Sequence, residues 1–158
     1  MPKPSDYETL LSKQFFRQEP ALQGATEALL SNAQDHLTAS KLLRASGLIT
    51  PSFTAAYEGL SQLFRTMFEY REVRPVDGCW TSATQVVCRD LGMHVAEQCF
   101  VSVLHDMRNP TSRNSSFPSA SAEKPRKIAD ILEKYLPVAQ GLMYQSFFTR
   151  VPEQCPLV

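Results

Sequence analysis

The residues best suited to chemistry stand together at positions 105–109, in the order His-Asp-Met-Arg-Asn. His105 and Arg108 are three residues apart and would share one face of a helix. An imidazole in such a place can move a proton from a ribose 2′-hydroxyl, while a guanidinium stabilises charge on a phosphate. The plainer interpretation is that basic side chains near a helix C-terminus are solvated and interact favourably with the helix dipole. From the residues alone, both interpretations stay open.

A second group of basic residues lies in and after a predicted loop. The group consists of Arg113, Lys124, Arg126 and Lys127. The loop, residues 110–121, is small, polar and punctuated by proline. Such a basic rim suits a phosphate backbone, but acidic residues at positions 130 and 133 make the local charge mixed. Mixed charge is typical of the solvated face of an amphipathic helix, so nucleic-acid binding is the less favoured alternative.

The sequence predicts no metal and no cofactor. Its four cysteines, at positions 79, 88, 99 and 155, form no CxxC pair and lack the Cys/His spacing of a zinc ribbon, and its three histidines are scattered. Cys79 and Cys88 have His94 nearby in the sequence, but no third group would orient that histidine as a base. Core thiols are the simpler interpretation, and Cys88 and Cys99 are expected to share one buried helix face.

Composition places the chain among globular proteins. It has 158 residues, of which 43% are hydrophobic and 20% charged, and its 16 basic residues balance 16 acidic ones. A balanced chain has no overall field that attracts nucleic acid or an anionic membrane. No apolar run is long enough to span a membrane and no export signal is seen, so we expect a cytoplasmic protein with reduced thiols and no membrane partner.

Capping signals and apolar spacing predict the first two helices. Ser5 and Glu8 form a capping box, so a short helix begins at Ser5, and residues 1–20 are expected to form an N-terminal capping helix. Apolar residues recur at helical spacing from Leu22 to Leu37 and predict a second helix, which Gly47 ends.

A third helix is predicted to begin at Thr50, which would cap it, with Pro51 in its first turn. One apolar face follows, suited to burial. It consists of Phe53, Tyr57, Leu60, Phe64 and Met67. Residues 71–80 contain proline and an Asp-Gly pair, so they are predicted to form a loop.

A long fourth helix is predicted from about Ser82 to Met107, and a fifth from Ile128 onward, with Pro137 expected to kink or split it. The fourth would carry one apolar face made of Cys88, Leu91, Val95, Cys99 and Val103. The predicted fold is therefore all-α, an up-and-down antiparallel bundle of four main helices plus a short N-terminal one, over residues 21–150, with an irregular tail at 151–158. The length of the fourth helix also favours a homodimer.

Taken in order, these features resemble the HEPN domains, all-α bundles of prokaryotic toxins, of partners of small nucleotidyltransferases and of RNA-targeting defence proteins. The resemblance covers about residues 33–145: residues 37–75 look like the family's paired helices, and residues 104–136 look like its arginine-bearing helix end, loop and final helix. Arg108 and Asn109 would occupy the family's polar arginine pair.

The resemblance implies a metal-independent endoribonuclease whose arginine and histidine meet across a two-fold dimer. Active members carry a histidine shortly after the arginine, but this sequence has Arg113 and Asn114 there, and only His105 could substitute. A member that lost nuclease chemistry and kept dimerisation or binding fits equally.

Three functions follow as hypotheses. The first is a HEPN-like module in RNA metabolism, toxin–antitoxin pairing or phage defence, with RNA, an antitoxin or a nucleotidyltransferase as partner. The second is a non-catalytic, dimeric protein-interaction or adaptor protein. The third is a helical regulator that binds nucleic acid through the basic rim.

Overall fold

The computed structural model describes residues 5–108 and 122–150, and this part of the chain is mostly helical. The predicted all-α bundle is confirmed, with one small sheet added. The helices are α1 Ser5–Ser12, α2 Ala25–Ala45, α3 Ile49–Arg71, α4 Trp80–Asp90, α5 Val95–Arg108 and α6 Glu123–Arg150, and the strands are β1 Phe16–Gln18 and β2 Val73–Pro75.

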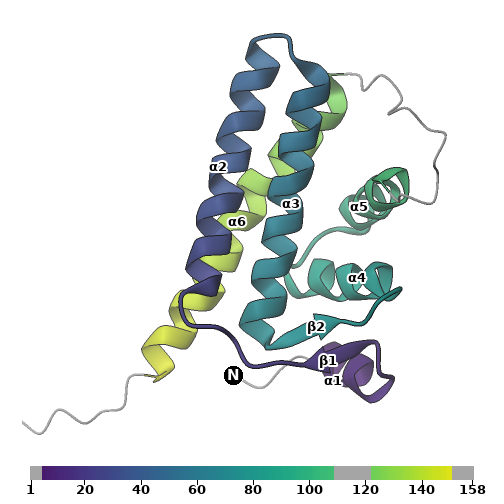
Figure 1. Cartoon of the computed structure of the whole chain (residues 1–158), viewed down its shortest axis with the longest axis vertical. Coiled ribbons are helices and arrows are strands. Elements are labelled where there is room, and N and C mark those ends of the chain that lie inside the picture. Colours follow the sequence, from purple (N-terminus) through teal and green to yellow (C-terminus); the bar gives the residue numbers. More distant parts are fainter. Residues whose placement is uncertain (1–4, 109–121, 151–158) are drawn as a thin grey trace, which may run out of the picture.

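Three long helices, α2, α3 and α6, form the bundle (Figure 1). α2 and α3 are antiparallel neighbours, joined by a tight turn at Gly47, whose φ of 78° suits glycine. Near this turn two buried serine hydroxyls link the helices by reciprocal hydrogen bonds. Ser40 Oγ donates to the Ser52 carbonyl at 2.9 Å, and Ser52 Oγ donates to the Ser40 carbonyl at 2.7 Å. Because each hydroxyl donates to a carbonyl, both side chains are buried without leaving an unpaired donor.

The core face predicted for the third helix is confirmed. Phe53, Leu60, Phe64 and Met67 are buried and Tyr57 packs against them as a partly buried residue. The predicted cap is wrong, because the N-cap is Leu48, two residues before Thr50, and it makes no side-chain cap hydrogen bond. Pro51 still lies in the first turn, where its missing N–H costs nothing.

The long fourth helix was wrongly predicted, because the chain breaks there into α4 and α5. Gly92, with φ 76°, ends α4: its N–H donates to the Arg89 carbonyl and the N–H of Met93 donates to the Cys88 carbonyl, which is a Schellman motif. The break turns the second half of the apolar run outward. Cys88 and Leu91 are buried, but Val95 and Val103 are 75% and 55% exposed, and Cys99 is exposed too. The homodimer was predicted from one long apolar helix, and the described part of the chain does not contain that helix.

The predicted fifth helix is confirmed as α6, but it continues through Pro137 as one element rather than splitting there. Ile128, Leu132 and Tyr135 are buried against the bundle, whereas Val138 points outward at 39% exposure. The proline lies on the exposed side of α6 as well.

The small sheet was not predicted. β1 and β2 pair antiparallel, with Phe16 opposite Pro75 and Gln18 opposite Val73. The predicted helix start at Ser5 is confirmed, but α1 ends at Ser12 and the following residues return along β2 (Figure 1). The buried Phe16 ring meets the Tyr7 and Phe68 rings at centroid distances of 5.7 and 5.8 Å, so the sheet attaches α1 to the end of α3.

Gly59 marks a close approach of the three long helices. A Cβ at this position would lie 2.9 Å from Leu132 Cδ1 on α6 and 3.2 Å from His36 Cβ on α2. Glycine is unfavourable inside a helix, so its presence in α3 is explained by the space its neighbours leave.

We expect Gly59→Val to lower the free energy of unfolding by about 2 kcal/mol or more, because the added carbons overpack this contact. Gly141→Ala is the matched control: Gly141 lies in α6 with open space around its Cα, so alanine should raise stability by up to about 1 kcal/mol. Urea unfolding followed by circular dichroism measures both. Equal effects of the two substitutions would contradict the packing described for Gly59.

Candidate functional site

His105, the predicted proton-transfer residue, lies in a narrow crevice between α3, α4 and α5. Its ring faces the Trp80 indole at a centroid distance of 6.2 Å. The cavity beside it has a volume of only about 10 Å³, room for about one water molecule. Its walls are formed by Tyr57, Leu60, Ser61, Phe64, Trp80, Thr84, Val101 and His105. A nucleotide does not fit into this space.

His105 Nδ1 is buried and has no hydrogen-bond partner among the described residues. Leaving a polar atom in this state costs about 1–3 kcal/mol, and natural proteins contain few such atoms. The ring therefore has an unmet hydrogen-bonding capacity on its inner side.

A three-residue contact holds α5, and with it His105, against α6. Tyr135 Oη donates to Glu97 Oε1 at 2.6 Å, and Lys134 Nζ lies 3.3 Å from the same oxygen. Burial alone would raise the pKa of Glu97, but these hydrogen bonds outweigh it and lower the pKa below its usual range. Glu97 is thus a carboxylate that anchors α5 rather than a proton donor.

The other predicted site residues are only partly assembled. Arg108 is the last residue of α5, but its side chain, like Asn109 and Arg113, lies outside the described residues. Its pairing with His105 therefore stays a prediction. On α6, Lys124 is half-buried and Arg126 is exposed.

Lys127 is engaged with neighbours on both sides. Its Nζ lies 3.3 Å from Glu123 Oε1 and 5.8 Å from the centroid of the Phe100 ring. The described part of the predicted basic rim, which lacks only Arg113, therefore has the mixed charge of a solvated helix face.

The three cysteines in the described part of the chain do not form a reactive site. Cys88 is buried as predicted, and desolvation raises the pKa of its thiol to about 12, so the thiol stays neutral. His94 is exposed, and Cys99 is exposed instead of sharing the buried face of Cys88. Within residues 5–108 and 122–150, no group of three or more potential ligands could hold a metal ion. No helix in these ranges is both long and apolar enough to cross a bilayer.

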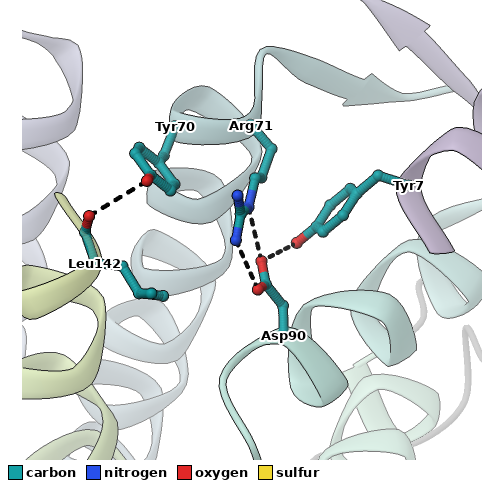
Figure 2. A network of polar contacts seen from close by, with 5 residues as sticks. All are labelled: Tyr7, Tyr70, Arg71, Asp90 and Leu142. Atoms are coloured by element: carbon teal, nitrogen blue, oxygen red, sulfur yellow. Dashed lines mark hydrogen bonds and ion pairs between the residues drawn. The ribbon is translucent and has the colours of Figure 1, made fainter. Parts of the chain in front are cut away.

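The most buried charges of the described chain form a network that the sequence did not predict (Figure 2). Arg71, the last residue of α3, is 8% exposed and binds Asp90, the last residue of α4, through two hydrogen bonds. Nε donates to Oδ2 at 3.0 Å and Nη2 to Oδ1 at 2.8 Å. Tyr7 on α1 donates to the same carboxylate at 2.8 Å.

The electrostatics of this network keep the Tyr7 hydroxyl and the Arg71 guanidinium protonated. Desolvation and the neighbouring Asp90 carboxylate raise the pKa of Tyr7, so its hydroxyl keeps the proton it donates. Burial alone would lower the pKa of Arg71, but its bonds to Asp90 raise it instead. The guanidinium also stacks over the Tyr70 ring, 4.9 Å from the centroid. A network with every partner in place is structural rather than reactive.

A larger cavity, which we call the α2/α6 groove, was also missed by sequence reasoning. It has a volume of about 580 Å³, within the range of ligand-binding clefts. It is lined by Thr26, Glu27, Leu30, Ser31, Gln34 and Asp35 on α2 and by Gln140, Met143 and Tyr144 on α6. The only signal in the sequence is the aromatic Tyr144 near the chain end, which the structure leaves 67% exposed.

We expect Arg71→Met alone to cost about 3–5 kcal/mol of stability, because it leaves the Asp90 carboxylate buried without its cation. The double variant Arg71→Met/Asp90→Leu should be more stable than that single variant, since no unpaired charge remains. Arg89→Met is the control: Arg89 pairs with Asp6 at 3.0 Å, but this pair is about half exposed and its loss should cost less than about 1 kcal/mol. Urea unfolding measures all three, and a double variant less stable than the single one would contradict the interpretation.

Comparisons of the chain with protein-family models, with curated proteins and with solved structures found no match. The resemblance to HEPN domains therefore rests on the sequence features alone.

Proposed function

We propose that this chain is a non-catalytic helical interaction module that receives a protein partner in the α2/α6 groove. The observation that carries the proposal is the contrast between the two cavities. The groove has about 580 Å³ of open space between two helices, while the crevice at His105 has about 10 Å³.

The chemistry of the groove supports binding of a peptide segment. Leu30 and Met143 are partly buried side chains that pack against the core, so they form an apolar floor. Tyr144 offers an exposed aromatic ring, a residue type enriched at protein interfaces. Two helices with an apolar floor between them are the usual receptor for a third helix.

The proposed partner follows from the resemblance described above. An antitoxin or a small nucleotidyltransferase encoded beside this chain is the first candidate, and a second copy of the chain is the other. The proposal places the protein in the cytoplasm, where the free thiols of Cys88 and Cys99 would stay reduced.

Photo-crosslinking in cells tests the proposal. We expect p-benzoylphenylalanine at Gln34, an exposed position in the groove, to give one discrete adduct with a partner protein. The same residue at Gln85, an exposed position on α4, should give none. Adding Tyr144→Glu should remove the Gln34 adduct, because a charge would replace the exposed ring. Equal adducts at both positions, or none at Gln34, would contradict the proposal.

A second function, metal-independent RNA cleavage of the HEPN type, is favoured by one observation. The buried Nδ1 of His105, one helical turn before Arg108, has no hydrogen-bond partner among the described residues, and an unsatisfied imidazole can mark a catalytic group. RNA could then be contacted only on the solvent side of the ring, because the crevice is too small.

Incubation of the purified chain with labelled RNA in EDTA separates the two functions. The interaction proposal predicts no cleavage. Cleavage that is lost in Arg108→Ala and in His105→Phe would replace the proposal with the nuclease. His105→Phe keeps a ring against Trp80 and removes the unpaired Nδ1, so the variant should unfold no more easily than the parent protein. Loss of cleavage in this variant would therefore not reflect unfolding.

A further inference from the structure

Among the described residues that line the α2/α6 groove, the charged side chains have one sign. They are Glu27 and Asp35, both exposed on α2, and none of these described lining residues is Lys, Arg or His. A groove of this kind repels phosphate groups and attracts cations. Because the whole chain is neutral, this negative character belongs to the groove rather than to the molecule.

We propose that the occupant of the groove is an amphipathic helix with two basic residues about two turns apart. This inference rests on the proposed function and adds the chemistry of the partner. Its apolar residues would contact Leu30 and Met143, and its two cations would face Glu27 and Asp35.

The geometry of α2 sets the spacing. Glu27 and Asp35 are separated by eight residues, which corresponds to about 12 Å along the helix axis. On a ligand helix, residues seven apart lie about 10.5 Å apart on nearly the same face. Leu30 falls between the two carboxylates in α2, so apolar residues of the ligand should fall between its two basic ones.

Other occupants lack the required chemistry. A metal ion needs ligands within coordination distance, whereas the two carboxylates are separated by two helical turns. Residues 151–158 of this chain, VPEQCPLV, follow α6 but contain no Lys or Arg, so they offer nothing to pair with the acidic rim.

Synthetic peptides test the inference on the full-length protein. The probe is a fluorescein-labelled, alanine-based helical peptide with two lysines seven residues apart and two leucines between them. Two matched peptides carry glutamates in place of the lysines, or the lysines only three residues apart. Fluorescence anisotropy gives the dissociation constants. We expect the first peptide to bind at least tenfold more tightly than the glutamate peptide, and more tightly than the short-spaced one.

Charge variants of the protein locate the binding. Glu27→Gln/Asp35→Asn should weaken binding of the lysine peptide about tenfold, because each exposed ion pair contributes a factor of about five at most to the affinity. Glu8→Gln/Asp130→Asn removes the same charge from exposed positions outside the groove and should change binding less than about twofold. Glu27→Lys/Asp35→Lys should reverse the preference toward the glutamate peptide, a result that unfolding cannot produce.

Equal weakening by the groove and control variants, equal binding of the lysine and glutamate peptides, or no saturable binding up to about 1 mM would overturn the inference. A Gln34 adduct together with failed peptide binding leaves the interaction function standing with a partner of other chemistry. Peptide binding without any Gln34 adduct in cells would instead count against the proposed function. An adduct of twice the chain mass would identify a second copy as the occupant and would overturn the inference that the occupant is a helix with two basic residues.

Discussion

The bidentate ion pair between Arg71 and Asp90 determines how the bundle meets the smaller helices. Arg71 ends α3, Asp90 ends α4, and Tyr7 adds α1 to the same carboxylate (Figure 2). Two parallel hydrogen bonds define an orientation as well as a distance. Both charges are buried, so any arrangement that separates them exposes an unpaired charge to an apolar surrounding. The direction in which the chain continues after α4 is therefore set at this point.

The place of His105 follows from that direction. Beyond Asp90 the Gly92 turn reverses the chain into α5, and Glu97 attaches α5 to Tyr135 on α6. These constraints press His105 against Trp80 and the side of α3. The packing that orders the imidazole also closes the space in front of it. A residue that looks catalytic in the sequence is thereby placed in a position suited to packing.

The larger of the two cavities described above lies on the other side of the bundle, between α2 and α6. Both helices come close to α3 at Gly59, which has no side chain of its own, and they leave a groove nearer the start of α2. The tight packing at Gly59 and the unfilled α2/α6 groove both follow from the size of the side chains along the same helices. The proposed binding function rests on this arrangement.

The sequence by itself determined the helical class, the start of α1, the end of α2 before Gly47, the presence of α6 and the buried face of α3. Each of these depends on capping or on apolar spacing within one helix, which are local properties. Tertiary structure decided the break at Gly92, the β1–β2 pairing, the partner of Arg71 and the groove. A glycine inside an apolar run is compatible with either a continuous or a broken helix, and strands of three residues show no period. The hydrogen bond from Tyr7 to Asp90 joins positions 83 residues apart, and no local pattern records such a contact.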